Sequence, residues 1–310
     1  MKNYSRFSKK TKIVFLVFGI LLFSFITLWG CKSVQTVENT PVVPNFVIED
    51  DVSFREIDEP YKYLFLRLYD VSYINPFYIA NVLKFGINLT DVNNNEATHA
   101  AINFSLNDDF YGLTSGGEYQ LAKESCLDTK ANKFLKKCDP EESSQITYAI
   151  KVTEEEFEKA QDMVESYAEN PDVKYDAGIN FKIANFAAKR KWHTDEENQS
   201  MEKMVYPKEK DRSKGDPNWV ETKFVCSSFV AYILKENIGY VGNWFKENDI
   251  NYQYVVVSDI PNIPGVERLF SSDFPQYEMA AEAFVEKYPE FNEYYDYHTP
   301  VSEIKEAEGW

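Results

Sequence analysis

The sequence has few of the residues that build metal centres, and it lacks the common phosphate-binding and nucleophile motifs. It holds three histidines and four cysteines among 310 residues, and no two of them stand at the spacing of metal ligands. A glycine-rich phosphate loop and a G-x-S-x-G elbow are both absent. The sequence therefore predicts no bound metal and no cofactor.

Positive charge is also scarce. Against 50 acidic residues the chain has 33 lysines and arginines, which gives a formal net charge of −17. Five of these cations fall within residues 1–30, so removal of that segment would change the net charge from −17 to −22. A surface of this sign repels nucleic acid and anionic lipid headgroups. We expect no nucleic-acid partner.

No repeat, and no linker rich in proline, glycine or serine, divides the middle of the chain. With 44% hydrophobic and 16% aromatic residues, the chain has ample material for a core. We expect one large domain over residues 56–277. A polar tether over 31–55 precedes it, and an acidic, aromatic tail over 278–310 follows it.

The first thirty residues have the layout of a signal peptide. Residues 1–12 carry five cations and no acid, and the seventeen residues from Ile13 to Trp29 carry no charge. A positive stretch followed by an apolar stretch and small residues is typical of a cleaved signal. The apolar stretch is at the short end of what crosses a ~30 Å hydrocarbon core, so an uncleaved membrane anchor is the alternative.

The four residues Leu28–Cys31 resemble the lipobox of bacterial lipoproteins. In that family diacylglycerol alkylates the cysteine thiol, and the cysteine becomes the new N-terminus. Trp29 departs from the pattern, because it is bulkier than the usual small residue. The resemblance implies a signal peptide over 1–30, a lipid on Cys31 that binds the membrane, and an extracytoplasmic location on the cell membrane or the outer membrane.

The other three cysteines differ in their surroundings. Cys126 and Cys138 are separated by eleven mostly polar residues, and in an oxidising compartment we favour a disulfide between them over two free thiols. Cys226 then has no partner. An odd cysteine in an exported protein is a candidate reactive thiol.

Hydrophobic periodicity predicts strands at 63–71 and 148–152, a short helix at 76–85, a β-hairpin at 98–106 and 110–115, and a helix within 278–288. Thr153 and Glu156 form a capping box, and the helix that follows them should end near Asn170. Residues 189–218 are strongly charged, which predicts a surface loop.

A further amphipathic helix is expected from Cys226 to about Asn237. Its apolar face is assigned to the core: Phe229, Val230, Ile233 and Leu234. Ser227 and Ser228 are expected to satisfy open amides of the first turn.

Cys226, the first residue of this predicted helix, is a candidate nucleophile. The N-terminal end of a helix and a nearby imidazolium, such as one on His99, both favour the thiolate, which is the attacking species in acyl transfer. The backbone amide of Cys226 would donate to the oxyanion that forms. The structural alternative is a buried cysteine that only packs, and a strand histidine that belongs to the core.

The order of these elements resembles that of the circularly permuted papain-like hydrolases, the YiiX-like branch of the NlpC superfamily. Five stretches carry the resemblance: THAAINF at 98–104, the strand and helix at 146–167, KYDAGINF at 174–181, KFVCSSFVAYIL at 223–234, and the segment at 254–270. The resemblance implies an α+β fold with a papain-like antiparallel sheet packed with helices, and with the Cys226 helix docked against the His99 strand.

By the same resemblance, Cys226 is the nucleophile and His99 is the general base that later protonates the leaving group. Relatives place a third polar residue on the following strand, to orient the histidine. This chain has Gly112 at that position, and Thr114 is the nearest side chain of the same parity, with Glu118 further along. We expect Thr114 to be the orienting residue, and an inactive protein if nothing orients His99.

The expected function is therefore an envelope-anchored cysteine hydrolase or acyltransferase. Its substrate would be a peptide or an acyl group, with an amide or ester bond in a peptidoglycan peptide or a lipid. The alternative is a catalytically inactive, papain-like binding module of the cell envelope, which the Gly112 departure and the long 189–218 segment favour.

Overall fold

The computed structural model describes residues 45–73, 97–107, 110–113, 121–124, 138–195, 198–209, 216, 219–273 and 276–295. These residues belong to one compact unit, Pro44–Trp310. The predicted signal peptide, the lipid site at Cys31 and the predicted helix at 76–85 lie outside the described residues, so these three expectations stay predictions.

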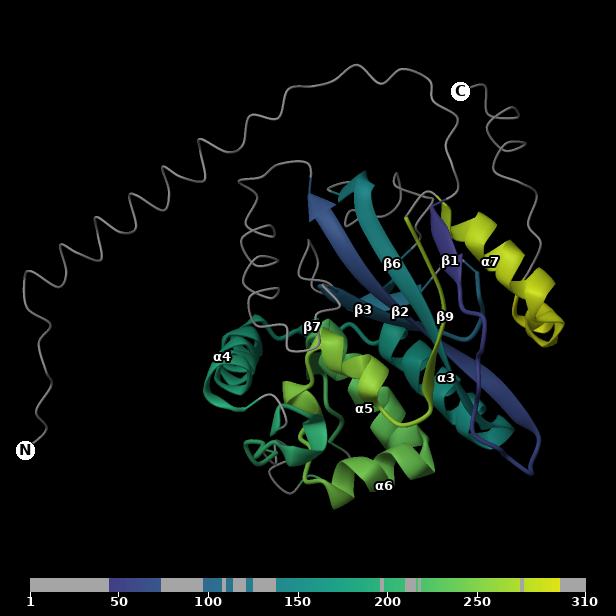
Figure 1. The fold of residues 1–310 in the computed structure, drawn as a ribbon. Coiled ribbons are helices and arrows are strands. Elements are labelled where there is room, and N and C mark those ends of the chain that lie inside the picture. The colour runs from purple at the N-terminus through teal and green to yellow at the C-terminus, as the bar shows by residue number, and fades with distance from the viewer. Residues whose placement is uncertain are drawn as a thin grey trace, which may run out of the picture. The chain divides into compact units, whose positions relative to one another are not determined.

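An antiparallel sheet forms the centre of this unit, with the strand order β1-β9-β6-β2-β3-β4-β5 (Figure 1). Its strands are β1 (Phe46–Ile48), β2 (Tyr61–Tyr73), β3 (His99–Asn103), β4 (Phe110–Leu113), β5 (Leu121–Glu124), β6 (Cys138–Thr153) and β9 (Val266–Asp273). Two further short strands pair in parallel, β7 (Lys174–Tyr175) and β8 (Lys223–Phe224). The predicted strands at 63–71 and 148–152 lie within β2 and β6, and β3 and β4 form the predicted antiparallel pair.

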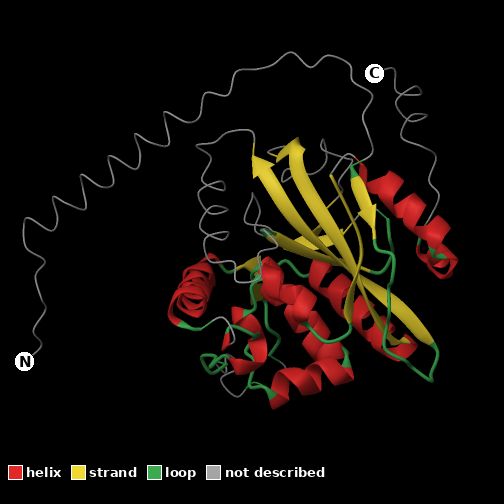
Figure 2. Ribbon diagram, viewed as in Figure 1, coloured by secondary structure: helices red, strands yellow, loops and turns green. Residues whose placement is uncertain are grey.

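Helices cover this sheet (Figure 2). They are α3 (Glu154–Glu169), α4 (Ala177–His193), α5 (Cys226–Asn237), α6 (Gly239–Glu247) and α7 (Tyr277–Lys287), with short 3-10 turns η3 (Met201–Lys203), η4 (Tyr252–Tyr254), η5 (Val257–Asn262) and η7 (Pro289–Tyr294). The fold is thus mixed α+β with an antiparallel sheet, which confirms the general fold class.

The alternation of side chains along β2 divides the interior into two cores. On one face, which we call the α5 face, the leucines of β2 pack with α3 and α5: Leu64, Leu66 and Leu68. On the other, which we call the α7 face, the aromatic residues of β2 pack with α7: Tyr63, Phe65 and Tyr69. Figure 1 shows α7 on one side of the sheet, and α3 and α5 on the other. Successive strand residues point to opposite faces, so both sides of this strand are buried.

The start of α3 is fixed by the capping box that the sequence predicted. The amide of Glu156 donates to the hydroxyl of Thr153 at 3.2 Å, and the amide of Thr153 donates to the carboxylate of Glu156 at 3.0 Å. The second carboxylate oxygen of Glu156 accepts from the amide of Gly239 at 2.8 Å. One acidic side chain therefore caps α3 and also binds the first residue of α6.

The ordered domain extends beyond 56–277 at both ends. Within the predicted tether, β1 pairs with β9, with Phe46 opposite Ser272. Within the predicted tail, α7 buries Ala281 and Phe284 on the α7 face. The physical reason is that this face of the sheet carries large aromatic side chains, and α7 is the helix that removes them from water.

The predicted surface loop at 189–218 begins too early, because α4 continues to His193. Arg190 lies on the inner side of this helix and is 1% exposed. Its Nη1 donates to both carboxylate oxygens of Asp259 at 2.7 Å, and its Nε donates to the carbonyl of Gln199 at 2.5 Å. The sequence did not predict that Arg190 is buried, because it stands in a run of cations and its partner is 69 positions away.

Replacement of Asp259 by asparagine should strongly destabilise the domain. It leaves the buried guanidinium of Arg190 without its counter-charge, and loss of one partner of a buried ion pair costs about 3–5 kcal/mol. Urea unfolding followed by circular dichroism measures this cost. The exposed Lys159–Glu155 pair is the control, and Glu155→Ala should cost far less because solvent screens an exposed ion pair. Equal losses in the two variants would contradict the assignment.

Candidate functional site

Cys226 is the first residue of α5, as the sequence predicted. Val225 is the N-cap with an extended backbone, and the amide of Phe229 donates to the carbonyl of Val225 at 2.9 Å. The thiol is free, and the residue is 7% exposed. The chain reaches this position through β8, whose pairing with β7 holds the segment before the helix in place.

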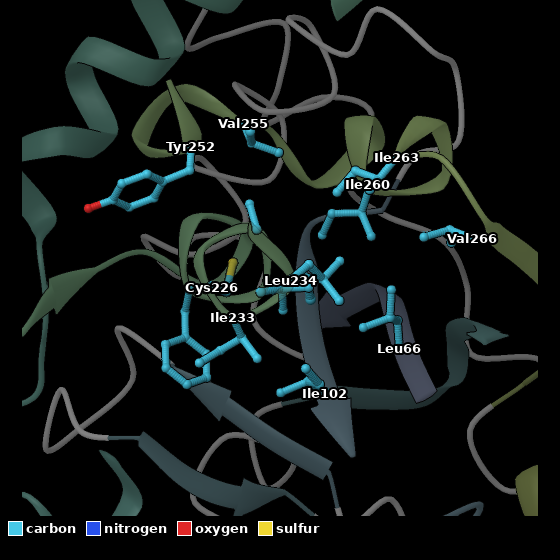
Figure 3. Packing of buried hydrophobic residues seen from close by; sticks show 14 of the residues in the cluster. Leu66, Ile102, Cys226, Ile233, Leu234, Tyr252, Val255, Ile260, Ile263 and Val266 are labelled. Atoms are coloured by element: carbon cyan, nitrogen blue, oxygen red, sulfur yellow. The ribbon is translucent and has the colours of Figure 1, made fainter. Parts of the chain in front are cut away.

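Helix α5 is buried on two sides (Figure 3). Leu66 and Ile102 of the sheet lie below it, and Val255 and Ile260 from the segment after α6 lie above it. The predicted core positions of the helix are all buried: Phe229, Val230, Ile233 and Leu234. As expected, α5 packs against β3. This packing makes Cys226 part of a rigid element.

The two serines that follow Cys226 have structural hydrogen bonds. The hydroxyl of Ser228 accepts from the amide of Val225 at 2.9 Å and donates to the carbonyl of the same residue at 3.1 Å. The hydroxyl of Ser227 donates to the carbonyl of Val255 at 2.7 Å. The expectation that the serines satisfy open amides holds for Ser228, which accepts from the amide of the N-cap residue, and was wrong for Ser227. Ser228 holds the N-cap residue, and Ser227 binds the neighbouring 3-10 turn.

The amides of residues 226–228 have no acceptor among the described residues. The first amides of a helix lack an intrahelical partner and form the positive end of its dipole. Here this end lies at the sulfur of Cys226. An anionic sulfur or an oxyanion at this position would be stabilised by these groups.

Tyr175 is a polar residue that lies near Cys226 along the fold. Its β7 position pairs with Phe224, two residues before Cys226, and its ring packs against the core that contains Cys226. Burial raises the pKa of Tyr175 well above its usual value, and a negative charge on the sulfur of Cys226 raises it further. The phenol therefore stays protonated at neutral pH and is a hydrogen-bond donor.

The phenolic oxygen of Tyr175 has a defined partner. Nδ2 of Asn180 donates to it at 2.7 Å. Asn180 lies in the first turns of α4, whose N-cap is Asp176, and the carboxylate of Asp176 accepts from the amides of Gly178 and Ile179. The cap thus fixes the position of the amide that holds Tyr175.

His99 is the first residue of β3, and its side chain belongs to the α7 face. It lies directly opposite Tyr69 in the ladder, and paired residues of antiparallel strands share a face. The two rings stack with centroids 5.6 Å apart and planes 22° apart. The next residue, Ala100, packs instead in the core that contains Cys226. The structure therefore brings the β3 strand to α5 but places the imidazole of His99 and the thiol of Cys226 on opposite faces of the sheet.

Arg67 of β2 binds the tyrosine on which His99 stacks. Arg67, which is fully buried, lies between the rings of Phe110 and Tyr277, with its Cζ 3.7 Å from each centroid. Its Nη1 donates to the hydroxyl of Tyr69 at 3.3 Å. Sequence reasoning missed Arg67, although a single arginine between aromatic residues of the same strand parity is a signal of a buried cation.

The remaining predicted site residues give less information. Gly112 lies in β4 opposite Ala101 of β3. Thr114, Glu118 and Cys126 lie outside the described residues, and of Cys138 only the backbone, at the start of β6, is described. The orienting role of Thr114 and the Cys126–Cys138 disulfide therefore stay predictions.

Sequence reasoning also missed Asn180. The segment at 174–181 carries part of the family resemblance, but no local pattern indicates that a residue five positions after Tyr175 binds its hydroxyl. Within the described ranges, no cluster of three or more His, Cys, Asp or Glu residues is arranged to hold a metal ion. In the same ranges, no helix has both the length and the apolar character needed to span a bilayer.

Comparison with protein-family models, with curated proteins and with solved structures finds no match to this chain.

The serine contacts give a direct test of this geometry. Ser228→Ala and Ser227→Ala each leave a buried backbone group without its partner, which should cost about 1–3 kcal/mol of unfolding free energy. Urea titration measures the loss, and mass spectrometry checks that Cys226 still reacts with iodoacetamide. Gln161→Ala is the control, because Gln161 bonds only to exposed Glu165. A stable variant that has lost Cys226 reactivity would assign the serine a chemical role instead.

Proposed function

We propose that the chain is an exported, lipid-anchored thiol hydrolase or acyltransferase in which Cys226 is the nucleophile. The observation that carries the proposal is the placement of a free thiol as the first residue of a buried helix, at the open amides of residues 226–228. Nucleophilic cysteines function in such electropositive surroundings, since the thiolate is the attacking species.

The proposed reaction is acyl transfer through a thioester. The sulfur of Cys226 attacks an amide or ester carbonyl, and the amine or alcohol departs with a proton. Water then releases the acid, or a second acceptor takes the acyl group. In this proposal the amide of Cys226 donates to the oxyanion that forms during each step.

The resemblance to permuted papain-like hydrolases supports the same assignment. Strand β3, capped helix α3 and Cys226-headed helix α5 follow one another in the order of that family, and α5 packs on β3. The lipobox-like segment that ends at Cys31 supports a location in the cell envelope, where peptidoglycan peptides and lipid acyl groups are the available substrates. The net negative charge of the chain does not attract an anionic polymer, which weakens the case for a cell-wall substrate.

The second candidate is a binding module of the envelope that keeps the fold without catalysis. The observation that favours it is the stack of His99 on Tyr69, on the face of the sheet away from Cys226. In this conformation the imidazole does not take the thiol proton. Catalysis with His99 as the base requires its side chain to reach the α5 face.

Alkylation by iodoacetamide at pH 7 separates the two candidates. The full chain is labelled in detergent, and the peptide that contains Cys226 is quantified by mass spectrometry over time. We expect Cys226 to react at least tenfold faster in the folded protein than in the urea-unfolded chain, because a nucleophilic cysteine is activated by its folded surroundings. Cys226→Ser supplies the blank for this peptide.

His99→Ala then tests the histidine. A rate at least tenfold lower than that of the wild type would assign the base role to His99. An unchanged, fast rate would reject the pair and leave Cys226 as the nucleophile. Slow alkylation in both proteins would reject the enzyme and favour the binding module.

A further inference from the structure

Helix α4 is basic in a chain whose net charge is strongly negative. Its 17 residues include three lysines and one arginine, but no aspartate or glutamate. Each of the other described α-helices carries at least one acidic residue. The acids nearest to α4 in the sequence, Asp176 and Asp195, stand before its first residue and after its last. The helix is therefore a local positive element on a protein of net charge −17.

Two of these lysines share the outer face of α4 with a tryptophan. Lys182, Asn185, Lys189 and Trp192 are three, four and three positions apart, which places them on one side of a helix. All four are exposed, whereas Arg190 points inward. Among the described residues, neither Lys182 nor Lys189 forms an ion pair. We call Lys182, Lys189 and Trp192 the α4 patch.

The exposure of Trp192 indicates what kind of surface the patch meets. Its side chain is 59% exposed, although an indole is the largest apolar group that a protein can bury. The segment after η3 lies beside α4, because the rings of Phe186 and Tyr206 pack at 5.0 Å, and it carries Val205, which is 90% exposed. Tryptophan is enriched where lipid meets water, since its ring is apolar and its N–H is a donor.

We infer that the α4 patch binds the surface of a bilayer that contains anionic lipids, with Trp192 at the level of the headgroups and the two lysines against phosphate groups. This inference rests on the membrane location in the proposed function, and it adds an orientation of the domain. The net negative charge does not oppose it, because exposed charges act mainly within a Debye length of about 8–10 Å in physiological salt. The lysines nearest the lipid therefore outweigh more distant acids.

The proposed anchor favours a bilayer over a soluble partner. Residues 32–44, thirteen in all, separate Cys31 from the described domain, and such a segment spans at most about 45 Å when extended. A domain of this size has a radius of gyration of about 18 Å, so the bilayer is always within reach of its surface. A short link gives an effective concentration in the millimolar range. A patch of two lysines and one tryptophan, too weak to bind lipid from solution, then suffices.

The test is the quenching of tryptophan fluorescence by brominated lipids in vesicles that carry the full chain. The difference between the wild type and Trp192→Phe isolates the signal of Trp192 from the other tryptophans. We expect it to be quenched in vesicles of phosphatidylcholine with phosphatidylglycerol, but not in phosphatidylcholine alone or at high salt. Lys182→Glu and Lys189→Glu should each weaken binding at least about fivefold, the contribution of one lysine at an anionic surface. Lys246→Glu is the matched control, because it makes the same charge change at an exposed lysine of α6.

Flotation of the vesicles separates failure of this inference from failure of the membrane location. If the chain floats with the vesicles but Trp192 is not quenched, or is quenched equally without anionic lipid, the inference is overturned and the location stands. A chain that does not float overturns both. Burial of Trp192 that rises with protein concentration in detergent alone would assign the patch to a second copy of the chain and overturn the inference. The reactivity of Cys226 is measured separately and does not depend on these results.

Discussion

The two-residue alternation of β2 is the constraint on which the rest of the structure depends. This strand is buried on both faces, with leucines on one and aromatic residues on the other. Because paired residues of neighbouring strands share a face, the side chains of β3 and β6 follow the same alternation. Each core then needs its own helices, α3 and α5 on one side and α7 on the other. A shift of one residue in the register of β3 would exchange the faces of His99 and Ala100.

The α7 face combines apolar packing with a buried cation. Removal of the Arg67 guanidinium from water is costly, and two aromatic rings at 3.7 Å and the hydroxyl of Tyr69 offset part of that cost. One of these rings, that of Tyr277, belongs to α7. The helix that covers this core therefore also contacts the buried guanidinium. The stack of His99 on Tyr69 lies beside this group. The histidine is therefore held by the packing of the α7 core.

Local signals in the sequence predicted most of the elements, and tertiary contacts account for what they did not predict. The capping box at Thr153 and the helix that begins at Cys226 depend on residues three or four positions apart, so a pattern suffices. The Arg190–Asp259 pair joins residues 69 positions apart, and the surrounding cations conceal it. The same limit applies to the site. Cys226 was predicted from its place at the start of a helix. The face of His99 depends instead on its pairing with Tyr69. The contact of Asn180 with a tyrosine hydroxyl depends on the helix cap at Asp176.

Under the proposed function, Cys226 reacts at the first turn of α5, where the amides lack intrahelical partners. Here the first-turn serines are engaged elsewhere, Ser228 with Val225 and Ser227 with Val255, so that the amides beside the sulfur remain open. The parallel β7–β8 pair places Tyr175 opposite Phe224, two residues before Cys226. His99 is the base that the sequence indicates, and its stack on Tyr69 would have to open before the imidazole could accept the thiol proton on the α5 face.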